Sequence, residues 1–286
     1  MNGLFDDGCL KGRIVDMLKY VGYSPVAEIF LIIVTLTPIP RTEESLVATS
    51  SSRDRFMREL QTAEVLNLVV NSMIDPSIVN ATPPQIDISL HPSSCCQLFQ
   101  DLLEKLSLEE MGNILLESFK NDTYLIESIV QAMVVKDVSQ EIRQCCAKVL
   151  GFLLRRAAEP EIVCFVSTNV STPPVPTYLP NFLYSYRESI VTAVRGLLSS
   201  VISAILNLDV EGSDGVKYSS YFIQMPFTVL RHLLIEVLVL TVESDDTAAE
   251  TISVELWKVF LTWTKQYPHN NIYHALFYRL IFAILR

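Results

Sequence analysis

The spacing of apolar residues constrains the fold of this chain more than any other feature of its sequence. Apolar residues recur every three or four positions in segment after segment; Leu10, Ile14, Met17 and Leu18, for example, would share one helix face. The alternation of apolar and polar residues that marks strands is nearly absent. This period is typical of amphipathic helices that bury one face. The sequence therefore predicts an all-α fold.

Prolines, serines and asparagines divide this pattern into helices and loops. We expect helices over residues 10–20, 25–36, 54–74, 93–106, 107–119, 123–135, 139–157, 181–208, 227–243, 247–267 and 272–286, with breaks near Thr62 and Gly196. We expect loops near 41–52, 75–91, 161–180 and 210–220, where prolines, glycines or serines gather. The serine at position 107 also begins a Ser-x-x-Glu sequence, which predicts a capping box.

The connections between the central helices are only a few residues long, so neighbouring helices must fold back as antiparallel hairpins. Such hairpins follow one another at a spacing of roughly 40 residues, which is typical of armadillo and HEAT arrays. We therefore expect an armadillo/HEAT-like α-solenoid of stacked helix hairpins that forms a single domain over residues 1–286. The final helix still reads LIFAILR at residue 286 without a polar cap, which favours an incomplete array.

Composition excludes several functional classes. Half of the 286 residues are hydrophobic and 19% are charged, so the chain can bury a large core and is not intrinsically disordered. Nine glycines are too few to favour the glycine-loop nucleotide folds. A formal net charge of -10 argues against nucleic acid as a partner and favours basic partner surfaces.

Cysteine usage and the N-terminal sequence bear on the cellular compartment. The six cysteines include two adjacent pairs but no Cys-x-x-Cys spacing, and no signal peptide is visible at the N-terminus. We expect reduced thiols and a cytoplasmic location, with the nucleus as a second compartment. A membrane span is not expected, because the longest apolar stretch, 190–208, contains Arg195. A polytopic membrane protein that uses this stretch is the less favoured alternative.

Motifs of enzyme chemistry are missing from the sequence. The segment Gly3-Leu-Phe-Asp-Asp-Gly8 opens like a phosphate loop, but Cys9 follows where lysine is required. His91 lies near Cys95 and Cys96 without a fourth ligand at suitable spacing, so buried thiols are the favoured interpretation. We predict no catalytic residue, no cofactor and no metal, and hence a protein that is not an enzyme.

One helix-turn-helix corner carries the most specific pattern. Pro268 ends an aromatic-rich helix that contains Trp263 and Tyr267, and Asn270 or Asn271 caps the next helix. His274 falls one turn into that helix. These five residues, Trp263, Tyr267, Asn270, Asn271 and His274, are the candidates for a partner-binding site or for a structural corner.

The same corner resembles a known family. The run Tyr267-Pro268-x-Asn270-Asn271-x-x-His274 is similar to the Phe/Tyr-x-Asn-Asn-x-Leu/Ile-His segment of the SAPS domain. The preceding segment from Pro226 to Arg231 resembles the Leu-Gly-x-x-Arg helix of that domain, and further upstream blocks follow in the same order. The SAPS domain belongs to eukaryotic regulatory subunits associated with Sit-four, or protein phosphatase six, phosphatases. By this resemblance the present domain is incomplete at both ends.

The resemblance implies a non-catalytic regulatory or scaffold subunit. Such a subunit binds the catalytic subunit of a serine/threonine protein phosphatase and modulates its activity or substrate targeting. Further scaffold subunits are additional candidate partners. The alternative is a generic helical-repeat adaptor in transport or trafficking, whose partner is not a phosphatase.

Overall fold

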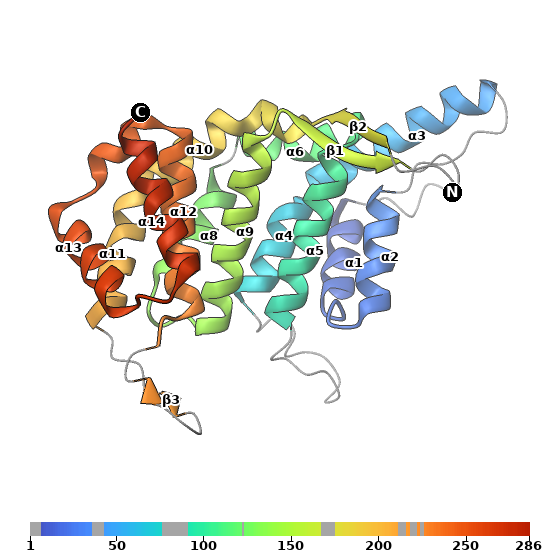
Figure 1. The fold of residues 1–286 in the computed structure, drawn as a ribbon. Helices are drawn as coiled ribbons and strands as arrows, with labels where there is room; N and C mark the ends of the chain where they lie inside the picture. Colours follow the sequence, from blue (N-terminus) through green and yellow to red (C-terminus); the bar gives the residue numbers. More distant parts are fainter. Residues whose placement is uncertain are drawn as a thin grey trace. The chain divides into compact units, whose positions relative to one another are not determined.

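A computed structural model describes residues 7–35, 43–75, 91–121, 123–166, 175–210, 216–217, 222–223 and 226–286, and it confirms the all-α class (Figure 1). The longer helices are α1 (Asp7–Leu18), α2 (Ser24–Thr35), α3 (Glu43–Thr62), α4 (Val65–Ile74), α5 (His91–Leu106), α8 (Tyr124–Val134), α9 (Gln140–Ala158), α10 (Arg187–Gly196), α11 (Leu198–Val210), α12 (Val229–Ser244), α13 (Val254–Gln266) and α14 (Asn271–Ile284). Short helices are α6 (Asn113–Leu116), α7 (Ser118–Asn121) and the 3-10 turns η3 (Glu110–Gly112), η4 (Phe182–Tyr186) and η5 (Asp246–Thr251). The predicted breaks near Thr62 and Gly196 coincide with the α3–α4 and α10–α11 junctions.

Residue contacts divide the chain into two compact units; the expectation of a single domain over residues 1–286 stays a prediction. Unit 1 comprises residues 1–125 and 155–190, and unit 2 comprises residues 126–154 and 191–286. The divisions fall inside α8, α9 and α10, so no linker in the sequence marks them. Each unit is therefore described by itself.

Two of the predicted loops contain regular structure. The region 41–52 was predicted as a loop, but α3 already begins at Glu43. Propagation of a helix costs much less than its nucleation, so the helix over residues 53–62 extends through a serine-rich segment of modest propensity. The region 161–180 contains strands β1 (Glu161–Val166) and β2 (Val175–Pro180), which form an antiparallel ribbon.

The other two predicted loops lie largely outside the described residues. The loop near 75–91 is described only at residue 75 and at residue 91, which begins α5. In the loop near 210–220 the structure describes residue 210, the last of α11, and the short strand β3 (Val216–Lys217). This strand pairs with β4 (Phe222–Ile223).

The predicted capping box at Ser107 is wrong. The Ser107 hydroxyl donates instead to the carbonyl oxygen of Glu104 at 2.9 Å, at the end of α5. Ser139, by contrast, caps α9, because its hydroxyl accepts a bond from the Ile142 amide at 3.3 Å.

Buried arginines complete the C-termini of two helices. The last carbonyls of an α-helix lack partners within the helix. Arg53 donates from Nη1 to the Ile33 carbonyl at 3.3 Å and from Nη2 to the Val34 carbonyl, both in the last turn of α2. Arg143 donates from Nε to the Met133 carbonyl of α8 at 3.1 Å. Both arginines are buried, so these bonds also satisfy groups that water cannot reach.

Two further helices end in the same way. The Asn181 side-chain amide donates to the carbonyls of Arg156 and Glu159, each at 2.6 Å, at the end of α9. Arg231 donates from Nη2 to the Leu208 carbonyl of α11 at 2.5 Å. No glycine in the described part of the chain has a positive φ. The last carbonyls of these helices are therefore satisfied by side chains from later segments, whereas many other helices end at a left-handed glycine.

None of the helices among the described residues is, alone, both long and apolar enough to cross a membrane. The pair Phe182–Gly196 and Leu198–Leu208 meets the length and composition criteria only when taken together, and it is bent by 52°.

Candidate functional site

The five residues singled out from the sequence lie at the corner between α13 and α14 in unit 2 (Figure 1). α13 begins at Ser253, whose hydroxyl accepts a bond from the Leu256 amide at 3.3 Å. Pro268 follows the end of α13 and cannot continue the helix with a backbone hydrogen bond. The chain then turns within a few residues and enters α14.

Trp263 is fully buried and belongs to an aromatic cluster. Its ring lies edge-on to Phe227, with the centroids 5.6 Å apart, and it also contacts Phe260 and Tyr273. The Tyr273 hydroxyl donates to the Phe260 carbonyl at 2.6 Å and so links α14 to α13. Trp263 therefore holds the two helices together and presents no surface to a partner.

Tyr267 closes the end of α13 and connects it to α12. Its amide donates to the Trp263 carbonyl at 2.9 Å, and its ring lies edge-on to Phe227 at 5.1 Å. Its hydroxyl accepts a hydrogen bond from Arg231 Nη1 at 3.0 Å. Tyr267 thus joins the two segments that carry the family resemblance, 226–231 and 267–274.

The two asparagines have different roles. The Asn270 side chain accepts a bond from the Tyr273 amide at 3.1 Å, which is the geometry of an N-cap. Asn271 is the exposed first residue of α14, and its amide donates to the His269 carbonyl at 3.1 Å. The sequence allowed the cap of α14 at Asn270 or at Asn271, and the structure places it at Asn270.

His274 lies one turn into α14, as predicted. Its amide donates to the Asn270 carbonyl at 3.0 Å, and its ring lies 5.7 Å from the Tyr273 ring. Its Nε2 is buried and has no hydrogen-bond partner among the described residues. The ring therefore packs against the corner rather than completing a polar network.

Arg231 is the central residue that the sequence reasoning did not single out. It is 2% exposed, and its guanidinium lies 5.2 Å from the centre of the Trp263 ring. Among the described residues its hydrogen-bond acceptors are neutral: the carbonyls of Leu208 and Pro226 and the hydroxyl of Tyr267. An arginine in a largely apolar helix was the available signal, because a buried charge needs such partners.

One face of α14 is apolar and exposed. On α14 and just past its end, Tyr278, Phe282 and Leu285 are 55%, 67% and 76% exposed and follow one another at intervals of four and three residues. This spacing places them on one side of the helix. We call these three residues the α14 stripe.

α14 is held firmly beneath this stripe. Arg279 binds both carboxylate oxygens of Glu243 on α12, through Nε at 2.9 Å and Nη2 at 2.6 Å. The corner fixes the start of α14, and this ion pair fixes its middle. The α14 stripe is therefore displayed on a rigid element.

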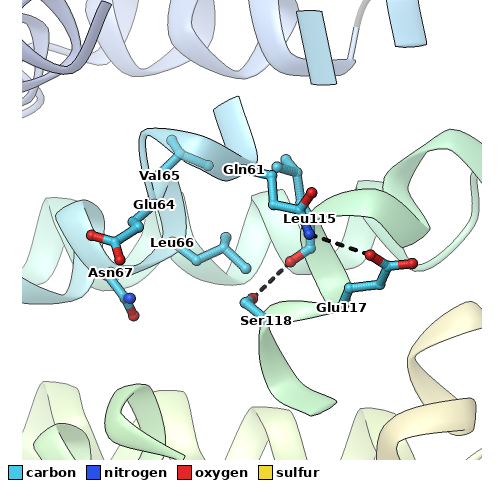
Figure 2. Close-up of a pocket in the computed structure, with 8 residues that line it drawn as sticks. All are labelled: Gln61, Glu64, Val65, Leu66, Asn67, Leu115, Glu117 and Ser118. Carbon is cyan, nitrogen blue, oxygen red and sulfur yellow. Dashed lines mark hydrogen bonds between the residues drawn. The ribbon is translucent and has the colours of Figure 1, made fainter. Parts of the chain in front are cut away.

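A small hollow of about 190 Å³ lies in unit 1 (Figure 2). Glu64 and Glu117 line it, and Glu64 alone among the described non-glycine residues has a positive φ, of 55°. Lys11 pairs with Glu64 at 3.2 Å, and the Gln61 amide donates to Glu117 at 3.3 Å. Because both carboxylates are engaged within the unit, we assign no ligand to this hollow.

The described residues contain no group of three or more His, Cys, Asp or Glu side chains that could hold a metal ion. His91 and Cys95 are both buried, and His91 Nε2 lies 3.4 Å from the Cys95 sulfur. Burial lowers the pKa of His91 and raises the pKa of Cys146. A buried thiol with a raised pKa is inert, which fits the interpretation of these cysteines as packing residues.

Comparisons with models of known protein families, with curated proteins and with solved structures find no match for this chain. The SAPS resemblance thus stays a prediction from the motifs of the corner.

Proposed function

We propose that the chain is a non-catalytic regulatory or scaffold subunit that binds the catalytic subunit of a serine/threonine protein phosphatase of the protein phosphatase six type. The observation that supports a binding role is the α14 stripe, an apolar surface that lies on the helix of the resemblance motif. The motif residues Trp263, Tyr267 and Asn270 act beneath it and set the direction of α14. The choice of a phosphatase as partner rests on the resemblance.

The chemistry of the α14 stripe suits a protein partner. Aromatic residues such as Tyr278 and Phe282 are common among the few residues that dominate interface energies. Because α14 is already fixed by the corner and by the Arg279–Glu243 pair, little conformational freedom would be lost on binding. We infer that the catalytic subunit buries these side chains and that the complex directs or modulates its activity.

The test is a binding measurement between the purified chain and a purified phosphatase six-type catalytic subunit. We expect the double variant Tyr278→Ser, Phe282→Ser to weaken binding at least about tenfold, because two aromatic anchors are lost. The matched control is Tyr124→Ser on α8, since Tyr124 is 57% exposed and so resembles Tyr278 in exposure. This control should bind as the unaltered chain does.

Absence of binding by the unaltered, folded chain would refute the phosphatase assignment. If other proteins bound through the α14 stripe instead, a generic helical-repeat adaptor would be the better description. Equal weakening by the Tyr124 variant would show that the α14 stripe is not the interface.

A further inference from the structure

The β1–β2 ribbon of unit 1 has two outer edges that differ in their capacity to pair. Within the part of the chain that the structure describes, these two strands form a sheet by themselves, with Val163 opposite Tyr178 and Phe165 opposite Pro176. Each strand therefore uses one side of its backbone for the ribbon and leaves the other side unused by any described strand.

The register shows which residues face outward. The Asn181 amide donates to the Pro160 carbonyl at 3.1 Å, so the pair just before the ribbon is a hydrogen-bonded one. Hydrogen-bonded and non-bonded pairs alternate along an antiparallel ladder. Glu161, Val163 and Phe165 of β1 therefore belong to non-bonded pairs and direct their N–H and C=O groups away from β2.

Prolines remove N–H donors from one edge and not from the other. The outward-facing residues of β2 are Pro176, Tyr178 and Pro180, and two of these have no N–H to donate. Proline is one of the means by which natural sheets protect an edge against pairing. The outer edge of β1 has no such protection, because all three of its outward residues carry an N–H.

The solvent face of the ribbon provides side chains beside the open edge. Ile162 is buried at 6% exposure and anchors the ribbon to unit 1, whereas Val163 and Tyr178 are 47% and 63% exposed. Because they are cross-strand partners, they form one apolar spot. Glu161, two residues before Val163, is exposed and belongs to no ion pair in the described part of unit 1.

We propose that the outer edge of β1 binds an extended segment of a partner protein as a third strand. Main-chain bonds to Glu161, Val163 and Phe165 provide the affinity, as in other cases of strand addition. The side chains select the segment: an apolar residue lies beside Val163, and a lysine or arginine two positions away pairs with Glu161. This site is separate from the α14 stripe and does not depend on the identity of the partner proposed above.

The probe is a synthetic eight-residue peptide of the repeat Lys-Thr-Val-Thr, which places lysine and valine two positions apart on one face of a strand, and its binding to the full chain is measured by calorimetry. Two control peptides accompany it. One has an N-methyl group on every residue and so has no N–H to donate along either edge; the other has glutamate in place of lysine. We expect the first peptide to bind, and each control to bind at least about tenfold more weakly.

The matched protein variants are Val163→Pro and Tyr178→Pro. Both positions face outward, so both variants keep the bonds between β1 and β2 while removing one outward N–H from one edge. We expect Val163→Pro to weaken peptide binding by about tenfold or more and Tyr178→Pro to change it less than about twofold. Circular dichroism and thermal unfolding verify that both variants are folded.

Several outcomes overturn the proposal. These are no binding of the lysine–valine peptide at millimolar concentration, equal binding of the N-methylated or glutamate peptide, and equal effects of the two proline variants. A dimer of the unaltered chain in sedimentation that Val163→Pro abolishes would also overturn it, because the occupant of the edge would then be a second copy of this chain.

Discussion

Arg231 offers the sharpest test of how the corner in unit 2 is held together. Its guanidinium is buried, stacks over Trp263 and, among the described residues, bonds to neutral oxygens; the two shortest of these bonds are 2.5 Å to Leu208 and 3.0 Å to Tyr267. A hydrogen bond that involves a charged group contributes about 1.5–3 kcal/mol. Removal of the guanidinium also removes the cost of keeping a charge away from water, which offsets part of this contribution.

We therefore expect Arg231→Met to lower the free energy of unfolding by about 2–3 kcal/mol. Arg231→Lys should cost more, about 3–5 kcal/mol, because lysine keeps a buried charge but cannot serve acceptors on several sides. Arginine's planar fork reaches Leu208 and Tyr267 together, whereas an ammonium group is compact and strongly hydrated. Comparison of the two stability costs thus separates the contribution of the planar guanidinium geometry from that of the positive charge.

The assay is urea unfolding at pH 7, followed by circular dichroism and by tryptophan fluorescence. Arg195→Met is the control, because Arg195 pairs with Asp245 at 2.8 Å near the surface of the same unit, and such pairs contribute at most about 1 kcal/mol. The reasoning would be refuted if Arg231→Lys were better tolerated than Arg231→Met, or if neither variant cost more than the control.

Three further predictions concern caps, pH and close packing. Asn270→Ala should cost about 1 kcal/mol through loss of the α14 cap, while Asn271→Ala should be nearly neutral; equal effects in urea unfolding would contradict the cap assignment. Burial lowers the pKa of His91 below its usual 6.5, so the unfolded chain takes up a proton that the folded chain does not. The free energy of unfolding should consequently be insensitive to His91 above pH 6.5 and fall as the pH drops below it, and His91→Gln should remove that part of the slope. Gly112→Ala should lower the free energy of unfolding by more than about 2 kcal/mol, because its Cβ would lie 2.3 Å from a backbone oxygen at the end of α5. At Gly196 a Cβ would meet nothing within 4 Å, so Gly196→Ala should raise the free energy of unfolding by up to about 1 kcal/mol. Thermal unfolding measures both.

Features that depend on local sequence were predictable. The three- and four-residue period placed most helices, and the asparagine pair after Pro268 placed the start of α14. These two predictions succeeded because caps and amphipathic faces are properties of a few neighbouring residues. The beginning of α3 at Glu43 was not predicted, because a polar, serine-rich segment is typical of a loop. The prediction did not take into account that the helix over the following residues can extend into this segment.

Features that depend on distant residues were not predictable. Arg231 acts through Leu208, Tyr267 and Trp263, and only the packed structure brings these together. The division into two units falls within helices, where sequence punctuation is absent. The open edge of β1 likewise depends on the register against β2, which the residues of either strand do not specify alone.

The capping of helix ends by later side chains has a consequence for the order in which this protein forms. The donors follow their acceptors by 10 residues for Arg143, by 23 for Arg231 and by up to 25 for Asn181. A helix that ends on a left-handed glycine completes itself, but each of these helices must wait for a donor that follows it along the chain and leaves the ribosome later. Their last turns therefore stay frayed until the next element arrives and locks them, so that each newly synthesised segment finishes the one before it.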